Sequence, residues 1–239
     1  MKQEYVHALE LIKSLKWIDL AHTLEEGMPS HPSHPKYECS LWKVPGDKAR
    51  MEKIIMDEHM GTHVDSTSHF VEDVNDPNYF DIDQMPLPLF SGHMSVLHIY
   101  DREPGYKVTM QDITKWEDTH FMIEEGDMVA FDFGWNKRWG TKQEGEGFLS
   151  DWPGLSWDAV NYLISKKVKA VATDCVSMDA SSSPLDDLPA HFSLLPAGII
   201  IYEMLNNLEQ IEDEALFVSL PLKLKNCTGS PVRPIAILL

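Results

Sequence analysis

Apolar residues recur at helical spacing near the N-terminus of the chain and again after Ser156. The first pattern predicts an amphipathic helix over residues 1–17, and the second predicts a helix that the Ser156 side chain caps. A shorter helix is expected over residues 109–116, because Thr109 can serve as its N-terminal cap. One more helical segment is expected over residues 189–195, after a loop rich in serine, proline and aspartate.

Short apolar runs between turn residues predict more strands than helices. Runs at residues 126–133 and 168–173 lie on either side of the helix after Ser156, so these three elements indicate a crossover unit. The other expected strands are residues 17–22, 40–44, 51–56, 92–100, 198–202, 216–222 and 232–239, the last two joined by a polar turn at 225–230. The expected fold class is therefore mixed α/β with a large sheet.

Segments rich in proline or polar residues predict loops at 27–36, 136–150 and 181–190. The first contains His31 and His34 among its prolines. A loop of this kind often forms the wall of a binding site, although a plain surface connection is the simpler interpretation. No repeat, low-complexity tract or break in composition divides the chain, so one domain over residues 1–239 is expected.

The 239 residues include 20 basic and 38 acidic side chains, which gives a formal net charge of −18. This excess argues against nucleic acid and anionic membrane surfaces as partners, because both attract concentrated positive charge. No apolar run approaches the roughly 20 residues that span a bilayer. Residues 1–17 also lack the apolar stretch of a signal peptide.

The three cysteines, Cys39, Cys175 and Cys227, are widely spaced and include no C-x-x-C pair. This pattern fits neither a disulfide framework nor a thiolate zinc site. The cytoplasm is therefore the expected location, and the thiols are expected to act as small buried hydrophobic groups.

The informative part of the sequence is a cluster of ligand-type side chains. His59, His63, Asp65 and His69 lie within eleven residues. Imidazole and carboxylate groups are typical ligands of zinc, manganese and iron. His63 and Asp65 share one face if the segment is extended, and Gly61 permits a bend after His59. Three such ligands could converge on one ion and leave positions open for water and substrate, which favours a metal site over a histidine-rich loop.

Several other catalytic motifs are absent from the sequence. Met60 stands where the H-E-x-x-H motif needs glutamate. The H-x-H-x-D-H arrangement of metallo-β-lactamase-like enzymes, the G-x-S-x-G elbow, the G-x-G-x-x-G fingerprint and the P-loop do not occur either.

The spacing His59-x-Gly-Thr-His63-x-Asp65-x-x-x-His69 resembles the signature of the cyclase family, which includes bacterial kynurenine formamidases (arylformamidases) and isatin hydrolases. The resemblance covers most of the chain from about Ile18. The other similar segments are 19–22, 27–29, 151–156, 171–174, 189–191, 202–203, 217–223 and 229–233. Thr67 departs from the pattern, because the family usually has proline there, and this predicts a less rigid loop. The acidic loop at 141–146 and the N-terminal helix have no match in the family pattern.

The resemblance implies a three-layer β/β/α fold of the swivelling type and a homodimer or homotetramer. It also implies one or two divalent ions per chain, zinc or manganese. The metal ligands that it implies are His59, His63, Asp65, His191 and Glu203. It assigns His69 the role of general acid and base. Glu203 gains physical support, because an acid in an apolar strand is costly to bury unless it is paired or ligated.

The predicted reaction is hydrolysis of an amide C–N bond by metal-activated water, with His69 relaying the proton. The substrate implied is an aryl formamide such as N-formylkynurenine, or a cyclic amide such as isatin. Two alternatives are a cyclase or lyase that acts on a carbonyl substrate with the same metal, and a metal-binding protein without catalysis.

Further residues have two interpretations each. The candidates for a pocket wall, with core packing as the alternative, are Phe70, Trp135 and Trp139. Asp174 could orient a neighbour of the site or cap a loop. His22, His31 and His34 are candidates to approach the site from the first loop.

Overall fold

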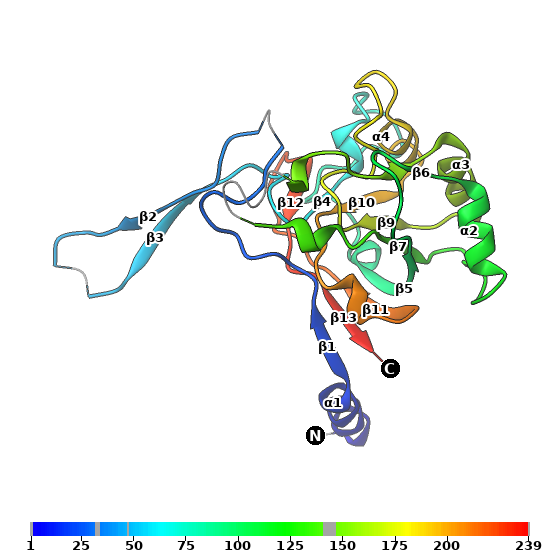
Figure 1. Cartoon of the computed structure of the whole chain (residues 1–239). Helices are drawn as coiled ribbons and strands as arrows, with labels where there is room; N and C mark the ends of the chain where they lie inside the picture. Colours follow the sequence, from blue (N-terminus) through cyan, green and yellow to red (C-terminus); the bar gives the residue numbers. More distant parts are fainter. Residues whose placement is uncertain (1, 32–33, 47, 141–146, 239) are drawn as a thin grey trace.

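The computed structural model describes residues 2–31, 34–46, 48–140 and 147–238. The acidic loop noted at 141–146 lies outside these ranges. Nine strands form one mixed sheet in the order β1-β13-β11-β5-β7-β9-β10-β4-β12 (Figure 1). In that order the strands are Lys16–Asp19, Ile235–Leu238, Glu214–Val218, Ser91–His98, Met128–Asp132, Ala170–Thr173, Ile200–Glu203, His63–Asp65 and Gly229–Pro231.

Two smaller pairs of strands accompany the sheet. The antiparallel hairpin of β2 (Glu38–Trp42) and β3 (Met51–Ile55) projects away from the main body (Figure 1). The parallel pair is β6 (Lys107–Val108) with β8 (Gly154–Leu155). The α-helices are α1 (Gln3–Ser14), α2 (Met110–Glu117), α3 (Trp157–Lys166) and α4 (Pro189–Leu194). The short 3-10 helices include η1 (Thr67–His69) and η3 (Trp135–Arg138).

The centre of the sheet is parallel, as β5, β7, β9 and β10 all run in the same direction. The predicted crossover is confirmed, because α3 connects the region of β7 to β9. Ser156 caps α3 by accepting a hydrogen bond from the backbone N–H of Ala159. At α2, Thr109 and Asp112 form a reciprocal capping box, each side chain accepting from the backbone of the other.

The sheet curls strongly about its inner face. The rings of Tyr202 on β10 and Phe217 on β11 lie 5.0 Å apart, although three strands separate β10 from β11. In a flat sheet four strand spacings would hold them about 19 Å apart. One core fills this curl, and a second core on the outer face packs against α3 and α4. The result is two β layers and one α layer, so the predicted fold class is confirmed.

Two predicted boundaries are wrong in instructive ways. Helix α1 ends at Ser14, and Trp17 instead lies in β1, where it pairs with Ile237. The apolar pattern could not separate the two because it continues from the helix into the strand. The polar turn predicted at 225–230 contains the start of β12, whose sequence Gly-Ser-Pro has no apolar alternation, yet it pairs with β4. Within the described ranges, no helix is both long and apolar enough to cross a bilayer.

Candidate metal centre

Strand β4 supplies the centre of the site. Its residues His63, Val64 and Asp65 are buried between β10 and β12. Side chains alternate along a strand, so His63 and Asp65 face one side and Val64 enters the inner core on the other. The antiparallel register with β10 sets His63 opposite Glu203. The shared face predicted for His63 and Asp65 is confirmed, and the sheet adds Glu203 from far along the chain.

The imidazole of His63 is held in one orientation by its own backbone neighbour. Its Nδ1 lies 2.8 Å from the carbonyl oxygen of Gly61, and a carbonyl can only accept, so Nδ1 carries the proton. Its Nε2 faces Asp65 Oδ1 at 3.4 Å and Glu203 Oε2 at 3.6 Å. In the neutral ring Nε2 therefore carries a lone pair, which points towards the Asp65 and Glu203 carboxylates.

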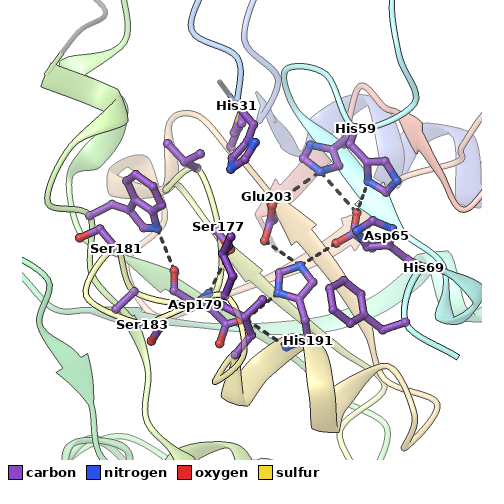
Figure 2. A pocket seen from close by; sticks show the side chains of 18 of the residues that line it. His31, His59, Asp65, His69, Ser177, Asp179, Ser181, Ser183, His191 and Glu203 are labelled. Carbon is purple, nitrogen blue, oxygen red and sulfur yellow. Dashed lines mark hydrogen bonds and ion pairs between the residues drawn. The ribbon is translucent and has the colours of Figure 1, made fainter. Parts of the chain in front are cut away.

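His191 on α4 repeats the same arrangement from the opposite wall (Figure 2). Asp179 accepts the Nδ1 proton at 2.6 Å and the backbone N–H groups of Ala190 and His191 at 2.8 and 3.1 Å. The Nε2 atom of His191 is then directed at Asp65 Oδ2, 3.5 Å away, and at Glu203 Oε1, 3.6 Å away. A carboxylate behind a histidine is the usual support of a metal-binding imidazole.

His59 and His69 complete the cluster on the side of β12. His59 Nδ1 lies 2.7 Å from Asp65 Oδ1. The His59 and His69 rings are stacked with centroids 4.1 Å apart, and His69 stands at the end of η1. Asp65 therefore contacts three imidazoles: His59, His63 and His191.

Charges in the cluster shift each other strongly. Burial lowers the pKa of His63, but Asp65 and Glu203 outweigh burial and raise it to about 9. Burial likewise acts against the charged form of His191, yet Asp179 and Asp65 hold its pKa well above the usual value. Burial and the neighbouring Asp65 raise the pKa of Glu203. This part of the cavity thus favours added positive charge, as a proton or as a metal ion.

His69 behaves differently. It is partly buried and makes no ion pair with a carboxylate among the described residues. Burial is the main cause that lowers its pKa to about 4, although Asp65 opposes the shift. His69 is therefore neutral at pH 7 and able to accept a proton.

The donor atoms fit a divalent ion. Asp65 Oδ2 is buried and finds no hydrogen-bond partner in the part of the chain that the structure describes. Ligand atoms of His63, Asp65 and Glu203 all lie within 4.8 Å of one another, and so do those of His59, Asp65 and His69. The two groups share Asp65, as a bridging carboxylate would require. Nitrogen and oxygen donors of this kind suit zinc or manganese. Geometry alone does not separate His69 from the ligands.

A cavity of about 310 Å³ opens above these residues (Figure 2). Of the three candidate histidines, His31 and His34 line it from the first loop, whereas His22 lies outside it, stacked on Trp139 at 3.9 Å. Of the three aromatic candidates, only Phe70 reaches the cavity.

The other two aromatic candidates pack elsewhere. Trp135 lies in the outer core and donates its indole proton to the carbonyl of Phe148, and Trp139 packs against His22. Asp174 caps the start of η3 by accepting from the N–H groups of Phe133, Trp135 and Asn136, so the loop-cap interpretation is the one that the structure supports.

Among the cavity residues that sequence reasoning missed, two are joined to each other and to His191 by hydrogen bonds. Asp179 orients His191, and Trp152 lines the cavity and donates its indole proton to the Asp179 carbonyl at 2.8 Å. Neither has a distinctive spacing to the ligands. Thr67 also shows a feature that the motif did not predict: its hydroxyl accepts from the Phe80 N–H at 3.1 Å, a tether that proline could not supply.

Comparison with known proteins shows the family of this chain. Residues 18–180 match the family model described as "Putative cyclase". The chain is 26% identical over 228 residues to a kynurenine formamidase of Bacillus cereus, a match that covers 94% of this chain and 98% of that protein.

Solved structures are similar over almost the whole chain. Isatin hydrolase A from Labrenzia aggregata, bound to benzyl benzoate, has a TM-score of 0.88 and 27% sequence identity over 98% of both chains. A structure described as a potential metal-dependent hydrolase with cyclase activity has a TM-score of 0.70 and 25% identity over 94% of this chain and 98% of that chain.

Proposed function

Because this chain belongs to the cyclase family, which it matches over residues 18–180, we propose that it hydrolyses an amide C–N bond with the help of a divalent metal. The family resemblance seen in the sequence is thereby confirmed, and the named relatives are hydrolases. One observation carries the proposal: the buried Oδ2 of Asp65 accepts no hydrogen bond from the described residues, while the Nε2 atoms of His63 and His191 and the Glu203 carboxylate face the same space.

The metal would be held by five side chains, which are His59, His63, Asp65, His191 and Glu203. One or two ions, zinc or manganese, match this set of nitrogen and oxygen donors. When bound, such an ion supplies Lewis acidity that activates water and polarises an amide carbonyl. The supports at Gly61 and Asp179 keep the Nε2 atoms of His63 and His191 directed at the site.

His69 is proposed as the general acid and base. Its neutral imidazole lines the cavity beside His59 and can take a proton from the attacking water. It can then deliver that proton to the departing nitrogen, which leaves as an amine.

The proposed substrate is an aryl formamide or a cyclic aromatic amide, in keeping with the relatives' names. The cavity has the volume of a small aromatic molecule, and Phe70, Trp152 and Leu188 contribute apolar lining in addition to the charged side chains. Apolar walls with a few polar groups are typical of small-molecule sites.

The decisive experiment combines elemental analysis with His69→Ala. The purified protein should contain zinc or manganese, and chelation should abolish hydrolysis of N-formylkynurenine or isatin. The variant should keep its metal while turnover falls by about a hundredfold or more. Full activity in the variant, or in fully metal-free protein, would contradict the proposal. Product analysis identifies a cyclase or lyase, because hydrolysis adds one water to the substrate.

We also propose a homodimer or homotetramer in the cytoplasm. The projecting β2–β3 hairpin supports assembly, since its large apolar side chains Leu41, Trp42 and Ile54 are more than half exposed in the single chain, at 60%, 51% and 53% (Figure 1). Exposed apolar patches often mark interfaces between proteins. Light scattering on purified protein would measure the mass, and a monomer at micromolar concentration would contradict this assembly.

A further inference from the structure

We propose that helix α1 docks on a second copy of this chain, in an acidic and apolar groove that β11 and its neighbours form on the outer face of the sheet. We call this hollow the β11 groove; its volume is about 510 Å³. The inference rests on the homo-oligomer proposed above and names one of its interfaces. It does not depend on the metal site or on amide hydrolysis.

Helix α1 has no buried face in the single chain. Every α1 residue whose side chain the structure describes is exposed, and the helix lies beside β1, apart from the other helices (Figure 1). The Trp17 indole on β1 donates to the carbonyl of Ile12 at 3.2 Å, which ties the end of the helix to the sheet. A helix of 12 residues is marginal in water by itself and depends on packing for its stability. A surface that covers α1 must therefore come from another molecule.

The two halves of α1 differ in charge. At 3.6 residues per turn, one half of the helix is centred on Leu9. The residues of this half are Lys2, Tyr5, Val6, Leu9, Ile12 and Lys13. Its four apolar side chains are 38% to 64% exposed. Both acids of the helix, Glu4 and Glu10, lie on the other half, so the Leu9 half is apolar and basic.

The outer face of the sheet is bare over β1, β13 and β11. Phe217 enters the inner core, so its neighbour Leu216 points to the outer face. The strand register places Trp17, Ile237 and Leu216 in one row across these three strands. Trp17 is 51% exposed and Leu216 is 37% exposed. Over the parallel centre of the sheet, by contrast, α3 and α4 cover this face.

Acidic side chains border the β11 groove. The lining includes Phe121, Glu212, Asp213, Glu214, Leu216 and Leu238. Imidazoles contact two of the acids, His93 at 2.8 Å from Glu214 and His120 at 3.2 Å from Asp213. Among the described residues, no lysine or arginine forms an ion pair with the three acids. Even with both imidazoles protonated, the groove keeps an excess negative charge beside its apolar surface, which complements the Leu9 half of α1.

A second copy of the chain supplies both surfaces at once. Helix α1 leads into β1, and β11 lies two strands away in the order β1-β13-β11, so helix and groove occupy the same end of the molecule (Figure 1). A two-fold axis near the edge strand β1 lets each α1 enter the groove of the other copy, which gives two identical contacts. An anionic membrane also attracts basic amphipathic helices, but the net charge of −18 opposes binding there.

The first test compares Leu9→Asp with Leu11→Asp. The two leucines are 46% and 49% exposed, but Leu11 lies on the other half of the helix, so it is the matched control. Light scattering at micromolar concentration should give half the wild-type mass for Leu9→Asp and the full mass for Leu11→Asp. The same mass in all three proteins, or an equal loss in both variants, would overturn the inference. A monomeric wild type would contradict the proposed assembly and this interface together.

The second test identifies the groove. Leu9→Cys and Leu216→Cys chains, co-expressed and treated with a short bismaleimide, should be joined between these two positions, as measured by mass spectrometry of the linked peptides. Because each chain carries only one of the two new thiols, this link can form only between copies. Leu11→Cys should give at least tenfold less of it. Links only between two α1 helices would overturn the docking. So would binding of the wild type to phosphatidylserine vesicles that Leu9→Asp abolishes without a change in mass.

Discussion

Two clusters of histidine and carboxylate groups, each built around a buried aspartate, differ in one respect. The metal-site cluster consists of His63, Asp65, His191 and Glu203. The strand-end cluster consists of His98, Tyr100, Asp132 and Asp174, at or just beyond the carboxyl ends of β5, β7 and β9. Ends of parallel strands are common ligand sites, so position and composition favour both clusters.

The strand-end cluster satisfies its own polar atoms. Asp132 Oδ2 accepts from His98 Nδ1 at 2.7 Å and from the Tyr100 hydroxyl, while Oδ1 accepts from the Gly134 N–H at 2.9 Å. His98 Nε2 donates to the carbonyl of Ile211 at 2.9 Å. Each polar atom has a protein partner, so the network fixes loops onto the sheet and leaves no group for a ligand.

The metal-site cluster leaves part of its hydrogen-bonding capacity unused. Asp65 Oδ2 has no hydrogen-bond partner in the described ranges, and the Nε2 atoms of His63 and His191 lie 3.4 to 3.6 Å from the carboxylate oxygens that they face. Unmatched buried groups cost free energy in the protein alone. The comparison teaches that unmet hydrogen-bonding capacity, more than residue type, separates a ligand site from a structural network.

The largest expected effect comes from neutralising the central acid of each cluster. Asp65→Asn should abolish metal binding and turnover, and the metal-free protein should also lose stability, because Asp65 is the ion-pair partner of three imidazoles. Asp132→Asn, the matched control, should keep its metal and lose about 3 kcal/mol of unfolding free energy, since it breaks a buried hydrogen-bonded pair. Elemental analysis and urea unfolding measure both quantities. Normal metal content in Asp65→Asn would remove the distinction between the clusters.

A smaller effect is expected at two further buried acids, Asp179 and Asp174, which accept hydrogen bonds from backbone N–H groups. Asp179→Asn should weaken metal affinity by about 10- to 100-fold, because it removes the partner that orients His191. Asp174→Asn is the matched change at another buried acid that accepts backbone N–H groups, and it should leave metal affinity unchanged. Chelator competition measures the affinity. Equal losses in the two variants would mean that the effect is general destabilisation.

The smallest effect is expected at His22, which tests whether a buried nitrogen without a hydrogen-bond partner is by itself a sign of a metal site. Its Nε2 also lacks a hydrogen-bond partner among the described atoms, but no carboxylate of the described residues forms an ion pair with it, so we expect acid sensitivity instead of metal binding. Burial lowers the pKa of His22 from 6.5 to about 4, so the folded state disfavours the protonated form. The unfolded state binds more protons below pH 6.5, and stability should fall as the pH drops from there towards 4.

Between pH 7 and pH 5.5 this group should account for about 1 kcal/mol of lost stability. Urea unfolding of His22→Leu should show a correspondingly weaker pH dependence over that interval. An identical pH dependence in the variant and the wild type would show that His22 does not contribute. Metal content should be the same in both proteins.

Much of the site could be predicted from local spacing. The segment from His59 to His69 has its ligands close in sequence, and the shared face of His63 and Asp65 follows from the period of a strand. The helix caps at Thr109 and Ser156 could also be predicted from the sequence, because a cap and its helix are neighbours in the chain. The motif further identified His191 and Glu203, but only through resemblance.

The sequence by itself thus determined the α/β class and the local set of ligands, because both depend on residues a few positions apart. Only the tertiary structure decided which distant groups complete the site. The register of β4 with β10 sets Glu203 opposite His63, the turn before α4 sets Asp179 behind His191, and β12 brings Thr228 to His59. These contacts arise from packing of the whole curled sheet, and no periodicity within one segment encodes them.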